Sequence, residues 1–340
     1  MASFLTTHRL ARELRDRFER AAAELGLRFD VVSLPAGGRR IEDDELGRIE
    51  LAFYPGDFTS DAGLTRSFLG GALRAPKLRW MQLPNAGVNH PVFARLLERG
   101  VRLSTGSGAA AEPIAQTVVG AMLSLARGFP AWSDAQRRHA WEPRNLEAPP
   151  RDLRGQTLLV FGFGAIGLEV ARLARALGLH VIGVRRRPSA TAAVADEVHP
   201  PAALDTLLPR ANWLVLTSPL TAETRDLFDA ARLARLPRGA YVLNVSRGEV
   251  VDEAALIEGL RTGRLGGAYL DVFREEPLPA SSPLWDLPNV IVSPHDSSPA
   301  SGNVERQTDI FVRNLAHLHR GEPLENEVSP DGVLLGGRSE

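Results

Sequence analysis

A glycine-rich turn between an apolar strand and an amphipathic helix constrains this chain more than any other feature. The stretch is LLVFGFGAIGLEVARLARALG, residues 158–178, in which three glycines have the spacing G-x-G-x-x-G. The first permits a tight turn, the second lets the backbone approach a pyrophosphate, and the third lets the helix pack against the strand. The first helical amides can then bind phosphate. The pattern predicts a dinucleotide-binding unit, with cofactor contacts from Gly162, Phe163, Gly164, Ala165, Ile166 and Gly167.

The next apolar run, HVIGV at residues 180–184, is followed by Arg185, Arg186 and Arg187. Dinucleotide-binding units often carry an Asp or Glu at this point, where it binds the ribose hydroxyls. A carboxylate there repels a 2′-phosphate, whereas guanidinium groups pair with phosphate and stack on adenine. We therefore predict that the three arginines form a cradle and that NADP(H) is preferred, with NAD(H) still accepted. The alternative is a solvated basic turn.

The rest of the chain predicts an α/β fold with two doubly wound parallel sheets. From residue 157 onward, apolar runs such as WLVLTS, AYVLNV and GGAYLDV alternate with helical stretches. This alternation is typical of a parallel sheet covered on both faces. A weaker version of it precedes residue 112. We expect the first domain to comprise residues 1–112 and 297–340, and the second to comprise residues 113–296.

Three segments carry more specific expectations. The N-terminus reads as a short lead followed by a charged amphipathic helix, and residues 112–129 read as a long helix that crosses between the domains. Residues 126–155, rich in Pro, Arg and Trp, show little helical period. We expect the last helix, within residues 303–321, to return to the first domain.

Composition excludes several classes of site. The chain has 340 residues, no cysteine, a single lysine at Lys77 and a formal net charge of −1. The absence of cysteine excludes disulfides, thiolate metal sites and cysteine nucleophiles, and no metal site is predicted. The charge does not indicate binding to nucleic acid or to an anionic membrane. No run approaches the roughly 18–20 apolar residues of a membrane span, and we expect a cytoplasmic protein.

Three polar residues follow the ends of expected strands. Arg247 follows YVLNVS, Glu276 lies in DVFREEPLP, and His295 lies in VIVSPHDSS. Ligands of open α/β sheets bind at the carboxyl ends of the strands. Each residue alone is compatible with a solvated loop, but their order after a dinucleotide turn predicts a catalytic set.

These stretches resemble the D-isomer-specific 2-hydroxyacid dehydrogenase family over nearly the full chain. The similarity is carried by LRWMQLPNAGVNH, LRGQTLLVFGFGAIG, LTSPLTAETRDLF, GAYVLNVSRGEVVDEAAL, GGAYLDVFREEPLP and SPLWDLPNVIVSPH. The family's Arg, Glu and His fall on Arg247, Glu276 and His295. The resemblance implies two Rossmann-like domains, the first of them flavodoxin-like, with the active site in the cleft between them.

The resemblance also implies a mechanism and a set of contacts. Arg247 would bind the carboxylate and carbonyl oxygen of a 2-oxo acid, His295 would transfer the proton, and Glu276 would orient the imidazole and stabilise its protonated form. The substrate would further contact Trp285, which either shields the site or fills the core, and the backbone amides of Ala86, Gly87 and Val88. Additional cofactor contacts are implied at Ser218, Pro219, Thr224, Val245, Ser246, Arg247, Asp271, His295 and Ser298.

Several alternatives remain open within this resemblance. One is a reductase of a 2-oxo acid, either glyoxylate, hydroxypyruvate or one with a larger side chain. A second is an NAD(P)-dependent dehydrogenase of another small anion, formate or phosphite. A third alternative is a non-enzymatic, nucleotide-sensing corepressor of the same fold. Gln116 stands where the family more often has Glu, and Asp296 adds a carboxylate beside His295. The resemblance implies a homodimer built through the cofactor domain, with residues 132–150 as a candidate arm.

Overall fold

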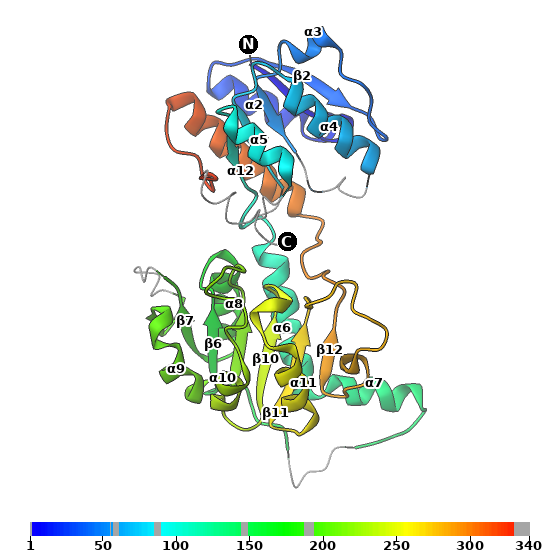
Figure 1. Cartoon of the computed structure of the whole chain (residues 1–340), viewed down its shortest axis with the longest axis vertical. Helices are drawn as coiled ribbons and strands as arrows, with labels where there is room; N and C mark the ends of the chain where they lie inside the picture. Colours follow the sequence, from blue (N-terminus) through cyan, green and yellow to red (C-terminus); the bar gives the residue numbers. More distant parts are fainter. Residues whose placement is uncertain are drawn as a thin grey trace. The chain divides into compact units, whose positions relative to one another are not determined.

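The structure, a computed structural model, describes residues 2–54, 56, 61–84, 90–143, 149–186 and 194–329 (Figure 1). The chain divides into two compact units. The first unit is Met1–Ala109 with Ser301–Glu340, and the second unit is Ala110–Ala300. The sequence predicts boundaries after residue 112 and before residue 297, whereas the units divide after Ala109 and after Ala300.

The first unit is built on a five-stranded parallel sheet in the order β2-β1-β3-β4-β5. Its strands are β1 (Ala2–Thr7), β2 (Phe29–Leu34), β3 (Leu51–Phe53), β4 (Trp80–Gln82) and β5 (Arg102–Ser104). Its helices are α1 (His8–Glu13), α2 (Arg15–Glu24), α3 (Asp43–Leu46), α4 (Ala62–Arg74), α5 (Pro91–Glu98) and α12 (Asn303–Arg320).

Aromatic packing joins α12 to the sheet of the first unit. The fully buried ring of Phe311 stacks on Trp80, with centroids 4.9 Å apart, and on Phe53, with centroids 4.8 Å apart. Large aromatic side chains contribute much of the energy of such a core. The C-terminal helix is therefore an integral part of the first unit, although the unit's other helices end at Glu98 and this helix begins only at Asn303.

The second unit contains a seven-stranded parallel sheet in the order β12-β11-β10-β9-β6-β7-β8. The strands are β6 (Thr157–Phe161), β7 (His180–Val184), β8 (Glu197–His199), β9 (Trp213–Leu216), β10 (Ala240–Asn244), β11 (Leu265–Leu270) and β12 (Val290–Val292). The α-helices are α6 (Ala111–Arg127), α7 (Phe129–Arg137), α8 (Ala165–Ala176), α9 (Leu204–Leu207), α10 (Ala230–Arg235) and α11 (Glu253–Arg261). Single 3-10 turns are η2 (Pro201–Ala203), η3 (Leu208–Arg210), η4 (Gly248–Val250) and η5 (Pro283–Trp285).

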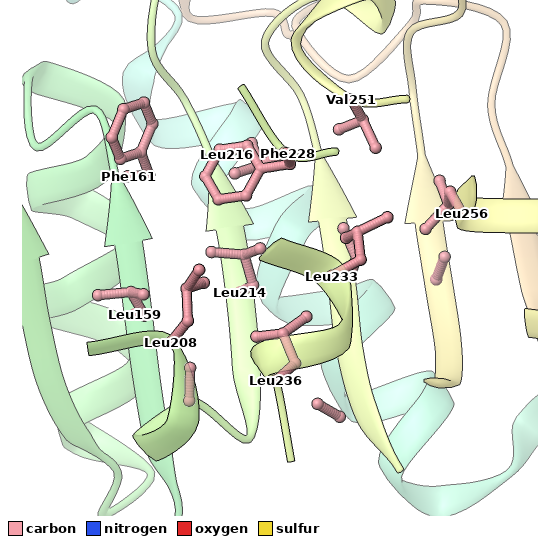
Figure 2. Packing of buried hydrophobic residues seen from close by; sticks show 14 of the residues in the cluster. Leu159, Phe161, Leu208, Leu214, Leu216, Phe228, Leu233, Leu236, Val251 and Leu256 are labelled. Atoms are coloured by element: carbon pink, nitrogen blue, oxygen red, sulfur yellow. The ribbon is translucent and has the colours of Figure 1, made fainter. Parts of the chain in front are cut away.

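Both faces of this sheet are buried, which explains the uninterrupted apolar runs. In β6, Leu159 and Phe161 belong to one hydrophobic cluster, while Leu158 and Val160 belong to the other. The helices α6 and α8 contribute to the second cluster. Figure 2 shows the first cluster, where strand residues pack against side chains that include Phe228, Leu233 and Leu236. The expected fold class of two Rossmann-like α/β units with parallel sheets is confirmed.

The structure corrects three local expectations. The expected N-terminal lead is strand β1, which pairs with both β2 and β3 and buries Phe4 and Leu5 completely. The expected loop after β7 includes a further strand, β8. Within the segment expected to be irregular, Gly128 adopts a left-handed conformation that ends α6, and Pro130 lies in the first turn of α7. A glycine directly after a helix and a proline in the first turn of a helix both stabilise the helix end at which they lie.

The long helix expected to cross between domains belongs to the second unit as α6, where it packs mainly against α8. None of the helices in the described ranges combines the length and the hydropathy that a membrane crossing requires.

Candidate active site

The glycine turn joins the carboxyl ends of two neighbouring strands. Gly162 has a φ of +98°, and a Cβ there would lie 2.3 Å from the backbone nitrogen of Ser218. A Cβ on Gly167 would lie 2.9 Å from the carbonyl oxygen of Gly162. A side chain at Gly162 would push β6 away from β9, and a side chain at Gly167 would push α8 away from β6. This is also the topological switch point of the sheet, since the chain leaves β6 for β7 on one side and returns to β9 on the other.

Phe163 supports this turn from within the protein. Its ring is buried and packs on Gly183 of β7, where a Cβ would lie 2.6 Å from the ring. The backbone amides of Gly162 and Phe163 both donate to the carbonyl oxygen of Val184, at 3.1 and 2.9 Å. The turn is therefore attached directly to the end of β7, and the backbone amide of Phe163 is already in use.

The N-terminus of α8 is suited to an anion. Its N-cap residue, Gly164, makes no side-chain capping hydrogen bond, and a Cβ on Gly164 would meet only the Gly162 oxygen, at 4.0 Å. The amides of Ala165, Ile166 and Gly167 are the first of the helix and so have no intrahelical acceptor. Open space above uncapped amides fits the pyrophosphate of a dinucleotide.

The turn after β9 borders the same place. Ser218 is buried, and its Oγ has no hydrogen-bond partner among the described residues. Thr224 closes the turn that follows, since its Oγ1 donates to the carbonyl oxygen of Pro219 at 2.8 Å and accepts the amide of Thr221 at 2.7 Å. An unpaired buried hydroxyl is costly unless a ligand satisfies it. Ser218 Oγ therefore also fits a polar cofactor bound against the glycine turn.

The arginine turn begins where β7 ends. Arg185 is half-buried and donates its backbone amide to the carbonyl oxygen of His199 in β8 at 3.0 Å, while Arg186 is exposed. Arg187 lies outside the described residues. The position of this turn thus depends on the edge strand β8.

One carboxylate holds that edge strand. Glu197 accepts hydrogen bonds from Arg210, from His199 at 2.9 Å and from His180 at 2.8 Å. Hydrogen bonding to Arg210 and the two histidines holds the pKa of the Glu197 carboxyl well below its usual range. The bonds connect β8 to both β7 and η3, although sequence analysis did not single out any of these residues.

Asn244 fixes the turn that carries Arg247. It is buried at the end of β10, its Nδ2 donates to the carbonyl oxygen of Arg247 at 3.0 Å, and its Oδ1 accepts both the amide and the hydroxyl of Ser246. The guanidinium of Arg247 donates to the Ser246 carbonyl oxygen at 2.6 Å. Val245, which precedes them, is buried in the core.

Asp271 fixes the turn that carries His295. Its buried carboxylate accepts four hydrogen bonds, from the hydroxyls of Ser293 and Ser297 and the amides of Asp296 and Ser297. A carboxylate offers about four acceptor positions, so none is left for a further donor. The carbonyl oxygen of Asp271 also accepts the amide of His295 at 2.9 Å. These bonds hold His295 at a φ of +53°, which is uncommon for a residue other than glycine.

The proposed acid and its neighbour are in contact. His295 Nδ1 lies 2.8 Å from Oε2 of Glu276, whose Oε1 accepts the amide of Phe273 at 3.0 Å. The two side chains are 48% and 37% exposed. Nε2 of His295 has no partner in the described part of the chain. Glu276 is therefore held by the backbone and in turn fixes the orientation of the imidazole.

Gly248 brings the Arg247 turn against the segment that leads to Glu276. A Cβ on Gly248 would lie 2.0 Å from the carbonyl carbon of Phe273 and 2.4 Å from the backbone nitrogen of Arg274. Sequence analysis did not single out Gly248, although its place directly after Arg247 was a usable signal. The contact sets the relative position of the turn with the arginine and the loop with the carboxylate.

The remaining residues that the sequence singles out are described in part by the structure. Trp285 is 51% exposed, and its indole donates to the carbonyl oxygen of Pro279 at 2.9 Å, so the core-filling alternative was wrong. Gln116 donates to Glu112 within α6 at 3.2 Å. Asp296 is exposed, and Ser298 is half-buried two residues beyond it. The expected substrate amides of Ala86, Gly87 and Val88 lie outside the described residues.

Comparison with known proteins shows which family the chain resembles. The family model described as the NAD binding domain of D-isomer specific 2-hydroxyacid dehydrogenases matches residues 119–297. Glyoxylate/hydroxypyruvate reductase B of Pectobacterium carotovorum is 35% identical over 282 residues, which cover 82% of this chain and 87% of that protein.

Two solved structures share the fold over nearly the whole chain. A D-isomer specific 2-hydroxyacid dehydrogenase of Xanthobacter autotrophicus, in complex with NADPH and MES, is 31% identical with a TM-score of 0.72, covering 97% of this chain and 98% of that one. An NADPH-dependent glyoxylate/hydroxypyruvate reductase of Sinorhizobium meliloti, in complex with NADP and sulfate, is 28% identical with a TM-score of 0.70, covering 99% and 100%. The chain therefore belongs to the D-isomer-specific 2-hydroxyacid dehydrogenases, a family of nicotinamide-dependent oxidoreductases.

Proposed function

We propose that this enzyme reduces a small 2-oxo acid, glyoxylate, hydroxypyruvate or a similar compound, to the D-2-hydroxy acid with NADPH as the preferred reductant. The observation that carries the proposal is the 2.8 Å contact between His295 and Glu276, in a loop that packs against the Arg247 turn. Carbonyl reduction requires a proton donor and an anchor for the substrate carboxylate, and these residues supply both.

The uncapped amides of α8, the space above Gly164 and the unpaired Oγ of Ser218 form the proposed site for the dinucleotide. When bound there, the reduced nicotinamide supplies the hydride that goes to C2 of the oxo acid. Arg247 would hold the substrate carboxylate and carbonyl oxygen with a bidentate, charge-assisted contact. The amides of Ala86, Gly87 and Val88 are proposed as a second anchor for the carboxylate.

His295 would hold the proton that passes to the carbonyl oxygen. With Glu276 at Nδ1, the imidazolium directs its remaining N–H, at Nε2, away from the carboxylate. Because Glu276 accepts the hydrogen bond from Nδ1, the proton that passes to the substrate is the one on Nε2. In the oxidative direction, neutral His295 accepts the alcohol proton at Nε2. Asp271 and its hydroxyl partners act indirectly, because they hold the backbone of this turn.

Replacing the proposed acid tests this mechanism. His295→Ala should lower kcat for glyoxylate or hydroxypyruvate by about 10²–10⁴-fold, which is the usual contribution of general acid catalysis. NADPH binding, followed by nicotinamide fluorescence, should change little. His319→Ala, at an exposed histidine of α12, is the matched control and should keep full activity. Near-normal turnover by His295→Ala would exclude the assignment.

The close contact at Gly248 gives a second test. Gly248→Ala must push the Arg247 turn away from Phe273, and displacements of about 1 Å in such sites can cost roughly a hundredfold in rate. We expect a loss of kcat/KM of that order with a folded protein by circular dichroism. Gly120→Ala is the control, because a Cβ there meets no atom within 4 Å. Equal activity of the two variants would show that the contact has no role in positioning.

The preference for NADPH is proposed from Arg185 and Arg186, which follow β7 where an acidic residue would repel a 2′-phosphate. Arg186→Ala should lower kcat/KM for NADPH by roughly ten- to a hundredfold, since a hydrogen bond to a charged group contributes about 1.5–3 kcal/mol. The value for NADH should stay within about twofold, and Arg127→Ala should change neither. Equal kcat/KM for NADPH and NADH in the unmodified enzyme would contradict the proposed preference.

A homodimer through the second unit is also proposed. Three large hydrophobic side chains of α7 and its flanks are exposed: Phe129 at 51%, Trp132 at 44% and Trp141 at 96%. The rings of Phe129 and Trp132 lie 5.2 Å apart, and Trp141 follows shortly after the end of α7. Exposed apolar side chains of this kind are what a second copy would cover.

Trp141→Ala should weaken self-association by about tenfold or more, because tryptophan is frequent among the residues that dominate interface energy. Light scattering during size-exclusion chromatography at several protein concentrations measures the effect. Trp285→Ala, at another half-exposed tryptophan, should leave the association unchanged. A monomer at all concentrations of the unmodified protein would refute the dimer.

A further inference from the structure

A pocket outside the site described above lies in the first unit. Its volume is about 650 Å³, within the range of roughly 300–1,000 Å³ typical of small-molecule sites. It lies beside the carboxyl ends of β1 and β2, the edge of a parallel sheet at which α/β proteins bind ligands. The lining residues are His8, Arg9, Ala11, Arg12, Arg15, Ser33 and Ala36.

The charged lining comes from α1 and from the start of α2. His8 and Arg12 are four residues apart on one face of α1, and Arg15 is the first residue of α2, directly after Leu14, which separates the two helices. Ala11 on this face has a short side chain and leaves room for the pocket. Among the described residues that line the pocket none is a carboxylate, so these residues do not neutralise the positive charge inside it.

The arginines of the pocket differ in whether a carboxylate compensates their charge. Arg9 pairs with Glu13 at 3.2 Å, which compensates its charge locally. Arg12 and Arg15 have no carboxylate partner in the part of the chain that the structure describes, and both side chains are exposed at the pocket. Ser33, half-buried near the end of β2, adds a hydroxyl to the lining. The pocket thus offers two guanidinium groups, an imidazole and a hydroxyl, all able to donate hydrogen bonds.

We propose that this pocket binds the phosphate group of a small phosphorylated metabolite. Arginine forks match the geometry and the double negative charge of a phosphomonoester better than those of a single carboxylate. The volume leaves room for a carbon skeleton beside the phosphate. Every lining residue belongs to the first unit, whereas the glycine turn and the arginine turn belong to the second.

The test is a calorimetric titration of the full chain with inorganic phosphate at constant ionic strength, with malonate as a second arm. We expect phosphate to bind and malonate to bind more weakly. Arg12→Gln/Arg15→Gln should weaken phosphate binding on the order of tenfold or more. Arg20→Gln/Arg28→Gln, which removes the same charge from exposed positions outside the lining, should bind as the unmodified protein does.

Two further readouts localise the binding. Phosphate should shift the ring proton resonances of His8, assigned with His8→Gln, and this shift should disappear in Arg12→Gln/Arg15→Gln. Binding should persist in Arg186→Ala, which alters only the arginine turn of the second unit. Unchanged phosphate affinity in Arg12→Gln/Arg15→Gln would overturn the proposal. Loss of binding in Arg186→Ala alone would overturn it as well, because the phosphate would then occupy the cofactor site.

Discussion

Direct contact between backbones at the carboxyl edge of the second sheet is the constraint on which the candidate site depends. Gly162 touches Ser218, and Gly248 touches Phe273, at distances that no side chain could fit between. The first contact joins the turns after β6 and β9, and the second joins the turn with Arg247 to the loop with Glu276. The absence of two side chains therefore allows the backbone approach that positions the functional groups.

Buried polar residues complete this positioning at two neighbouring strands. Asn244, at the end of β10, forms hydrogen bonds with backbone groups of the turn that carries Arg247. Asp271, directly after β11, accepts hydrogen bonds from backbone amides of the turn that carries His295. The amide of Asp271 donates to the carbonyl oxygen of Asn244 at 3.0 Å, which links the two anchors. A buried carboxylate is stable only when its acceptor positions are filled, so the loop that fills them has little freedom to move. The anchors explain how an exposed histidine can be held at a positive φ.

The sequence was most informative where one physical cause dominates. Strands buried on both faces leave long apolar runs, so most strands of the second unit were predictable, as was the turn between β6 and α8. Strand β1 was missed because Ser3, Thr6 and Thr7 interrupt its apolar pattern, and α7 was missed because proline at a helix start resembles a loop. The fourfold bonding of Asp271 and the Gly248 contact could not be predicted, because both depend on partners more than 20 residues away in the chain.

The packing of the Phe163 ring on Gly183 determines which substitutions this part of the protein can accept during evolution. The ring and the paired amides at Val184 tie the glycine turn to the end of β7, so the backbone reaches the same place whatever side chains follow that strand. The charge at Arg185 and Arg186 can therefore be exchanged by point substitution without refolding the turn. The ligand selectivity proposed for these arginines thus rests on residues that can be substituted singly, whereas any side chain at Gly183 would clash with the Phe163 ring beneath the turn.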